Sequence, residues 1–155
     1  MIISVASGKG GTGKTTVATN LALSIDNVQF IDCDVEEPNA HIFLKPKIEE
    51  RVEVSIPIPK VDEGKCNYCG KCAEICAFNA IAVLKEKVLV FPELCHGCGG
   101  CSLLCPENAI AETGNKIGIA EIGKADNILF VDGKLDIGEP MSPPIIREVK
   151  KYINT

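Results

Sequence analysis

Eight of the nine cysteines lie in two runs that share the same internal spacing. The first run is Cys66-x₂-Cys69-x₂-Cys72-x₃-Cys76, and the second is Cys95-x₂-Cys98-x₂-Cys101-x₃-Cys105. The second run begins 29 residues after the first, and the letters "NAIA" follow both runs. A repeat unit of this size predicts two similar half-structures that face each other.

This spacing resembles that of the bacterial ferredoxins, in which three closely spaced thiolates hold one cluster and the fourth holds the other cluster. The sequence therefore predicts two 4Fe–4S clusters. The expected ligands are Cys66, Cys69, Cys72 and Cys105 for one cluster, and Cys95, Cys98, Cys101 and Cys76 for the other. Two zinc sites are the alternative, but zinc usually takes its cysteines from two separated Cys-x₂-Cys pairs. Ala77 stands where Pro106 follows the second run, a difference that removes no ligand.

Composition and charge exclude several classes of function. The chain has 155 residues, a net charge of −5 and no tryptophan, and it shows no basic patch, so we expect no nucleic-acid partner. No apolar run approaches the ~20 residues of a membrane helix, and the N-terminus lacks the basic start of a signal peptide. We therefore expect a cytoplasmic protein without membrane insertion, in which this many cysteines indicate metal or redox chemistry.

The stretch "GKGGTGKTT" matches the phosphate-binding loop G-x-x-x-x-G-K-[ST]. It lies between an expected strand over residues 2–7 and an expected helix over residues 14–25. We expect Lys14 to reach the β- and γ-phosphates of ATP and the Thr15 hydroxyl to ligate Mg²⁺. The predicted nucleotide-binding residues of the loop are Gly8, Lys9, Gly10, Gly11, Thr12, Gly13, Lys14, Thr15 and Thr16.

Two acidic residues end the next expected strand, "VQFIDCD". In a parallel sheet the carboxyl ends of the strands face the nucleotide. Asp32 is therefore predicted to hold Mg²⁺ through water, and Asp34 is predicted to orient or activate the attacking water. A strand-ending acid that merely caps the next turn is the alternative for this pair. Cys33, between them, is interpreted as a small buried residue.

The loop with its additional Lys9 resembles the deviant Walker A ATPases, which include the MinD/ParA group and the nitrogenase iron protein. Together with the aspartate pair and the cysteine runs, it resembles MinD-superfamily ATPases with an inserted ferredoxin domain. The resemblance implies an ATP-dependent homodimer in which Lys9 contacts nucleotide across the interface and acts with Asp34 in catalysis. It implies an α/β fold: a partial P-loop parallel sheet over residues 1–59 and 114–155, interrupted by an α+β bacterial-type ferredoxin domain over residues 60–113.

The remaining segments agree with such a fold. The alternating residues 51–60 predict a half-exposed strand at an edge, because Pro57 and Pro59 disfavour a central position. Short strands are expected after Gly114, and residues 142–153 predict a final helix that Ser142 could cap. His41 and His96 are interpreted as exposed loop residues.

The sequence departs from the family at one point, because no Asp-x-Pro-Pro switch motif is found. Asp132 also ends an apolar strand, but its neighbours place it in the strand after the insertion. The C-terminal half of the family fold is therefore expected to be absent, as in a fragment, a split gene product or a shortened relative. Whether the chain is an ATPase on its own stays open, and a homodimer partner or a complementing C-terminal chain is expected.

Three functions remain as alternatives. The preferred one is a nucleotide-binding protein with two 4Fe–4S clusters that transfers electrons to a redox partner protein, with ATP binding or hydrolysis as a gate. The second is an iron–sulfur carrier or scaffold ATPase. The third is a plain ferredoxin-type electron carrier whose nucleotide loop is vestigial.

Overall fold

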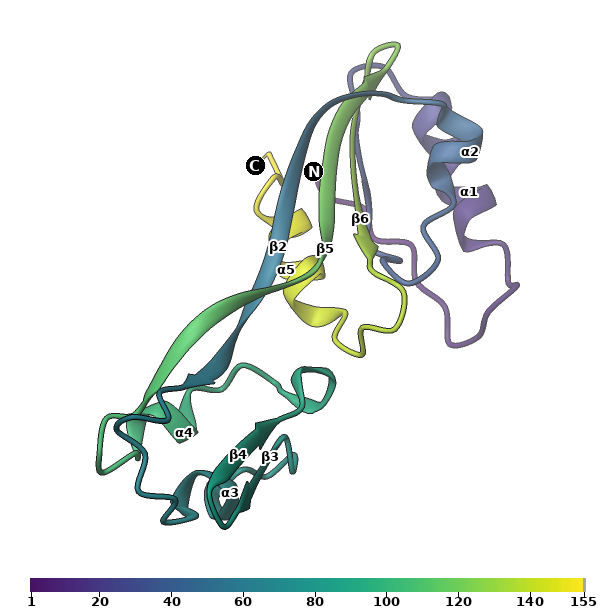
Figure 1. The fold of residues 1–155 in the computed structure, drawn as a ribbon. Coiled ribbons are helices and arrows are strands. Elements are labelled where there is room, and N and C mark those ends of the chain that lie inside the picture. Colours follow the sequence, from purple (N-terminus) through teal and green to yellow (C-terminus); the bar gives the residue numbers. More distant parts are fainter. Residues whose placement is uncertain (155) are drawn as a thin grey trace. The chain divides into compact units, whose positions relative to one another are not determined.

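The computed structural model describes residues 1–154, which form two compact units (Figure 1). The first unit comprises Met1–Val54, Gly118–Asp136 and, in the described chain, residues 142–154. The second unit comprises Ser55–Ile117 and Ile137–Met141. Two long strands, β2 (Lys47–Val61) and β5 (Ile110–Ala125), contribute residues to both units.

The first unit is built on a mixed four-stranded sheet with the order β1-β6-β5-β2. Strand β1 (Gln29–Asp32) runs parallel to β6 (Ile128–Leu135), so that Asp32 lies opposite Asp132. Strand β5 runs antiparallel to β6. A two-residue loop joins them, and its first residue, Asp126, has a left-handed backbone with φ 50°, as tight hairpins require.

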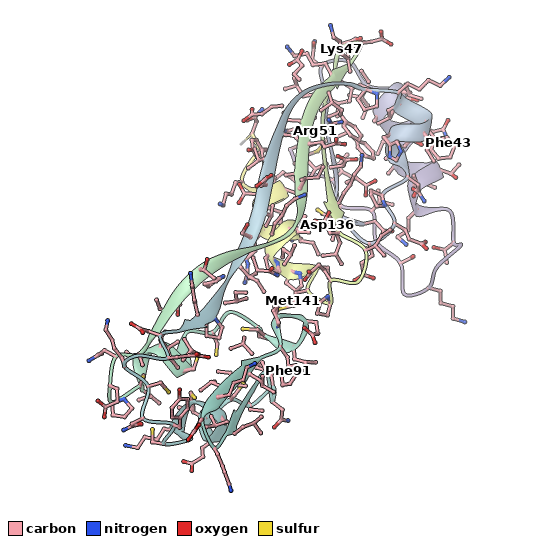
Figure 2. The ribbon with its side chains drawn as sticks, in the orientation of Figure 1. Phe43, Lys47, Arg51, Phe91, Asp136 and Met141 are labelled. Carbon is pink, nitrogen blue, oxygen red and sulfur yellow. The ribbon has the colours of Figure 1, made fainter. Side chains whose placement is uncertain are left out.

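Helices cover both faces of this sheet. Helices α1 (Lys14–Leu23) and α2 (Ala40–Leu44) cover one face, where the fully buried Phe130 packs with Ala22 and Leu44. Phe43 projects from α2 and is 55% exposed (Figure 2). Residues of a strand point alternately to its two sides, so Gly133 faces the side opposite to Phe130. Helix α5 (Pro143–Lys150) covers this opposite face.

The second unit contains the cysteine runs on short elements. These are α3 (Lys71–Ile75), β3 (Ile81–Leu84), β4 (Lys87–Val90), the 3₁₀ helix η1 (Pro92–Leu94) and α4 (Gly100–Leu103). Strands β3 and β4 form an antiparallel hairpin, and α3 contacts α4. The buried apolar residues of this unit include Ala80, Ile81, Ala109 and Ile110.

Several predictions of secondary structure are confirmed. Helices α1 and α5 form where periodicity indicated, with Pro143 in the first turn of α5, although Ser142 makes no side-chain capping bond. Strand β2 lies at an edge of the sheet and alternates between exposed and more buried residues. The expected short strands after Gly114 are instead the two long strands β5 and β6, which make the sheet mixed rather than parallel.

The prediction of a strand over residues 2–7 is wrong, because this segment has no regular structure. Ile2 and Ile3 are 65% and 54% exposed. A strand requires a neighbour for its backbone N–H and C=O groups. Within the described residues, residues 2–7 pair with no strand, and the outer edge of β1 is also left unpaired. No helix in residues 1–154 is long and apolar enough to cross a membrane.

The contact between α5 and β6 depends on the missing side chain of Gly133. A Cβ at this position would lie 2.6 Å from Cγ2 of Ile145 and 2.8 Å from Cγ2 of Val149. We therefore expect Gly133→Ala to lower the free energy of unfolding by about 1–3 kcal/mol, the usual cost of overpacking. Urea denaturation measures the change.

Gly114→Ala is the matched control, because Gly114 also lies in a strand but its Cβ would meet only Cβ of Ser55 at 3.8 Å. This variant should stay within about 0.5 kcal/mol of the wild type. Equal effects of the two substitutions would contradict the close packing of α5 on Gly133.

Candidate functional site

The glycine loop, residues 8–13, leads directly into α1 and is open on its outer side. Gly11 and Gly13 have left-handed backbones with φ 71° and 85°, a region that side chains disfavour. A Cβ on either would meet nothing within 4 Å. The loop is held from within, because the Thr12 hydroxyl donates to Oγ of Ser7 at 2.7 Å and the Ser7 hydroxyl donates to the carbonyl of Lys9 at 2.9 Å.

The first turn of α1 provides a place for an anion. Gly13 precedes the helix and supplies no side-chain capping bond, so the first backbone N–H groups of α1 keep their donor capacity. Lys14 is the first residue of the helix. Helix N-termini of this length attract phosphate through these N–H groups and the helix dipole. In the described part of the chain, neither Lys9 nor Lys14 is engaged in an ion pair.

Asp32 already has two hydrogen-bond donors. Its Oδ1 accepts from the backbone N–H of Asp34 at 3.0 Å, and its Oδ2 accepts from the backbone N–H of Ala40 at 3.3 Å. The side chain therefore holds the loop after β1 and the start of α2 together, as the capping alternative predicts. Burial raises its pKa. Asp34 itself is exposed, and Cys33 is half-buried, with burial raising its pKa.

Asp132 is a buried acid whose importance the sequence did not reveal. Its side chain is fully buried, and neither oxygen has a hydrogen-bond partner among the described residues. The Nδ1 atom of His41 and the Nζ atom of Lys134 each lie 4.0 Å from its Oδ2. Burial raises the pKa of Asp132 to about 6. The sequence does show that an acid ends the apolar strand "ILFVD". It does not show that this acid is buried, because the burial of Asp132 depends on how α2 packs.

His41 is not the exposed loop residue that was expected. It belongs to the first turn of α2, and its Nδ1 is buried without a hydrogen-bond partner among the described residues. His96 is exposed, as expected, but its ring stacks on Phe78 with 3.6 Å between the ring centroids.

Glu121 continues a row of acids across the sheet, because it lies opposite Asp132 on β5. Unlike Asp132, it is well paired: Nε of Arg51, on β2 (Figure 2), lies 2.7 Å from its Oε1, and Nζ of Lys134 bonds its Oε2. Burial acts to raise its pKa, but the hydrogen bonds from Lys134 and Arg51 outweigh burial, so that the pKa is lowered.

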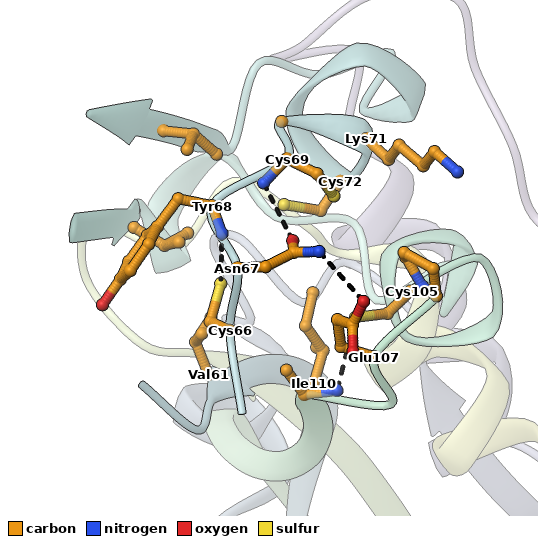
Figure 3. Close-up of a pocket in the computed structure, with 15 residues that line it drawn as sticks. Val61, Cys66, Asn67, Tyr68, Cys69, Lys71, Cys72, Cys105, Glu107 and Ile110 are labelled. Atoms are coloured by element: carbon orange, nitrogen blue, oxygen red, sulfur yellow. Dashed lines mark hydrogen bonds between the residues drawn. The ribbon is translucent and has the colours of Figure 1, made fainter. Parts of the chain in front are cut away.

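The cysteines line two separate pockets in the second unit. The first cysteine pocket contains Cys66, Cys69, Cys72 and Cys105 (Figure 3), and the second contains Cys76, Cys95, Cys98 and Cys101. Each pocket thus takes three cysteines from one run and the last cysteine from the other run. Apolar side chains such as Val61 and Ile110 line the first, and Ile75 and Ile81 line the second.

The two halves of the repeat have the same local backbone. Tyr68 and Gly97, each two residues after the first cysteine of a run, have φ values of 55° and 62°. Their N–H groups point at Sγ of Cys66 at 3.4 Å and of Cys95 at 3.5 Å. The last cysteines follow the same rule: the N–H groups of Ala80 and Ala109 lie 3.3 Å from Sγ of Cys76 and Cys105.

These donor sets are suited to a metal group of more than one atom. Burial raises the pKa of the Cys72 and Cys101 thiols, whereas the thiolate is the form that ligates metal, so a bound cation would be needed to keep them ionised. In residues 1–154, no three His, Cys, Asp or Glu side chains converge so that they could hold a single metal ion. Four thiols with backbone N–H groups directed at sulfur are the environment of iron–sulfur clusters.

The raised pKa of Asp132 predicts a pH-dependent stability. The carboxyl keeps its proton up to about pH 6 in the folded chain but loses it near 3.8 when unfolded. Its contribution is complete below the unfolded value and disappears as the pH rises through 6. We expect the free energy of unfolding of Asp132→Asn, relative to the wild type, to rise by about 1.4 kcal/mol between pH 5 and 7.5.

Urea denaturation at several pH values measures this difference, and Asp126→Asn serves as a charge-matched control, because Asp126 is exposed in the turn between β5 and β6. A difference between Asp132→Asn and the wild type that stays constant over this pH range would contradict the burial of Asp132 and its raised pKa.

Comparison with known proteins identifies the family. Residues 3–152 match the model described as the CobQ/CobB/MinD/ParA nucleotide binding domain. Two uncharacterized proteins of Methanocaldococcus jannaschii, MJ0579 and MJ0578, are each 36% identical over 98% of this chain. The chain spans about half of these relatives, 56% and 54% of their lengths. The iron-sulfur protein required for NADH dehydrogenase of Arabidopsis thaliana mitochondria is 36% identical over 80 residues, 46% of this chain and 23% of that protein. Because the family model covers nearly all of it, the chain belongs to the CobQ/CobB/MinD/ParA nucleotide-binding family.

Proposed function

We propose that this chain is a nucleotide-binding protein that holds two 4Fe–4S clusters and transfers electrons, with ATP binding or hydrolysis as a gate. The observation that carries this proposal is the composition of the two cysteine pockets. Each is lined by four cysteines, three from one run and the fourth from the other run. This exchange is what two-cluster ferredoxins use, so each pocket would have a complete set of cluster ligands from one chain.

The geometry favours a cluster over zinc. A zinc ion needs its four ligands to converge on one point, and no such convergence exists among the described residues. In a 4Fe–4S cluster each thiolate binds a different iron atom, so the four sulfurs surround a larger volume. The N–H groups directed at Sγ of Cys66, Cys76, Cys95 and Cys105 would stabilise the negative charge of such a group.

A bound cluster would supply one-electron chemistry, and the protein residues would control access to it. Electrons would come from a low-potential one-electron donor protein and leave to a redox partner that accepts one electron. Val61, Ile81 and Ile110 would keep water away from the sulfurs. A complete ligand set in each pocket also argues against a scaffold, because a scaffold must release its cluster.

For the nucleotide we propose the roles that the loop geometry supports. The backbone of Gly8–Gly13 and the open start of α1 would hold the phosphates of ATP, with Lys14 at the β- and γ-phosphates. Thr15 would ligate Mg²⁺, Asp32 would reach it through water, and Asp34 would orient the attacking water. Thr16 would complete the binding loop.

We further propose that a second polypeptide or a further part of the same protein completes the first unit. Strand β1 lies at the edge of the sheet in the described chain, and the apolar residues 2–7 have no strand partner. Unpaired apolar edges of this kind require cover. A homodimer in which Lys9 reaches the other nucleotide, or a complementing C-terminal chain, would provide it.

Calorimetric titration of MgATP into the anaerobically purified, cluster-loaded chain tests nucleotide binding. We expect a Kd in the micromolar range and a loss of binding in Lys14→Ala, because the loop would lose its charge partner for the phosphates. Lys47→Ala is the control: it removes the same charge from the exposed start of β2 in the same unit, and it should bind as the wild type does.

Absence of binding to the wild-type chain would favour a plain electron carrier with a vestigial loop. Equal loss of binding in Lys14→Ala and Lys47→Ala would show that net charge, and not the loop, attracts the nucleotide. Either result would overturn the nucleotide-gated part of the proposal and leave the cluster part to be tested by iron content.

A further inference from the structure

We infer that two carboxylates, Glu107 and Glu112, each lower the reduction potential of one cysteine pocket, and that the second pocket has the lower potential of the two. The inference rests on the proposed function, since it assumes that both pockets hold clusters. Charged residues that line only one pocket each make the two pockets unequal.

The backbone makes the same hydrogen bonds to sulfur in the two pockets. In each pocket one N–H group points at the first cysteine of a run, and another points at the fourth cysteine, which comes from the other run. The four N···S distances fall between 3.3 and 3.5 Å. Hydrogen bonds to sulfur are one of the main factors that set cluster potentials. Because these bonds are matched in the two pockets, they give no reason for a difference between the two potentials.

The charged side chains that line the pockets are not matched. The first pocket is lined by Glu107 and Lys71, and the second is lined by Glu112 without a lysine or arginine. With histidine neutral, the formal charge of the lining residues is zero in the first pocket and −1 in the second. Reduction adds a negative charge to a cluster, so a carboxylate opposes it and an ammonium group favours it.

The charged residues of the two pockets do not stand at corresponding positions of the repeat. Shifted by the 29-residue repeat, Glu107 corresponds to Phe78 and Glu112 corresponds to Val83. Lys71 corresponds to Gly100. Neither carboxylate therefore has an acidic counterpart in the other half. Each lines only one of the two pockets, so each is expected to act mainly on that pocket.

Hydrogen bonds from the cysteine loops hold both carboxylates in place. Nδ2 of Asn67, which follows Cys66, donates to Oε1 of Glu107 at 2.9 Å (Figure 3). The hydroxyl of Ser102, which follows Cys101, donates to Oε1 of Glu112 at 2.7 Å. This same oxygen lies 2.9 Å from the position that a Cβ on Gly99 would occupy. The Glu112 carboxylate therefore lies against the loop between Cys98 and Cys101.

The polarity of the two pockets also favours a lower reduction potential in the second pocket. Asn67 and Glu107 meet at the first pocket, and the residues that correspond to them in the repeat, His96 and Phe78, meet at the second. The first pair is a polar contact, whereas the second is a pair of stacked rings with an interplanar angle of 6°. The Glu107 carboxylate itself opposes reduction, but Asn67 and Lys71 make the boundary of the first pocket more polar than that of the second, and a less polar boundary stabilises added negative charge less well. An external one-electron donor should therefore reduce the cluster in the first pocket before the cluster in the second.

The test is a reductive titration of the cluster-loaded chain followed by electron paramagnetic resonance. The wild type should show two one-electron steps. Glu112→Gln should shift the lower step upward and leave the upper step in place. Glu107→Gln should shift the upper step upward and leave the lower step in place. Both glutamines keep an oxygen for the bond from Ser102 or Asn67, so the fold of the loops should be retained.

Glu53→Gln is the control, because it removes one negative charge from β2 in the first unit and lines neither pocket. Neither step should move in this variant. Iron and sulfide contents that correspond to fewer than two clusters would overturn the proposed function and this inference together. Two clusters that are reduced in a single step, or a Glu112→Gln variant that shifts the upper step or neither, would overturn this inference alone.

Discussion

The second unit depends on the exchange of one cysteine between its two halves. Cys76 lies after the first run but lines the second pocket, and Cys105 lies after the second run but lines the first. Neither half can complete its set of four thiols without the other, so the short helices α3 and α4 must lie against each other. Helices of four or five residues are too short to be stable alone. A metal group in each pocket would supply the stabilisation that the small apolar core of Ala80, Ile81, Ala109 and Ile110 provides only in part.

The first unit is held by a different kind of interaction. Phe130 is buried under α1 and α2, and Gly133, three residues later on the same strand, accepts Ile145 and Val149 of α5 on the opposite face. Between these residues lies Asp132, a buried carboxyl beside Asp32 at the carboxyl end of β1. Buried polar groups without partners are costly, and proteins keep them mainly at functional sites. Strand β6 therefore combines the core of the sheet with the acidic row Asp32, Asp132 and Glu121.

Much of this arrangement could be predicted from local signals. The cysteine spacing separates the eight thiols into the same two groups that line the pockets, and the glycine loop before α1 follows from its motif. The predictions that failed concern residues whose structure depends on partners distant in the sequence. Residues 2–7 have the composition of a strand, but composition cannot tell whether a neighbouring strand is present. The burial of Asp132 and its closeness to His41 were not recognised, because both result from the packing of α2 over β6. Glu107 and Glu112 look like ordinary surface acids until the cysteine loops place them beside the pockets.

The exchange of the fourth cysteine is tested most directly by serine substitutions read by electron paramagnetic resonance. The loaded wild-type chain should contain about eight iron atoms, four for each cluster. Cys105→Ser should alter the same cluster signal as Cys66→Ser, and Cys76→Ser should alter the same signal as Cys95→Ser. If Cys105→Ser instead alters the signal that Cys95→Ser alters, each half holds its own four cysteines, and the exchange between the two halves is contradicted.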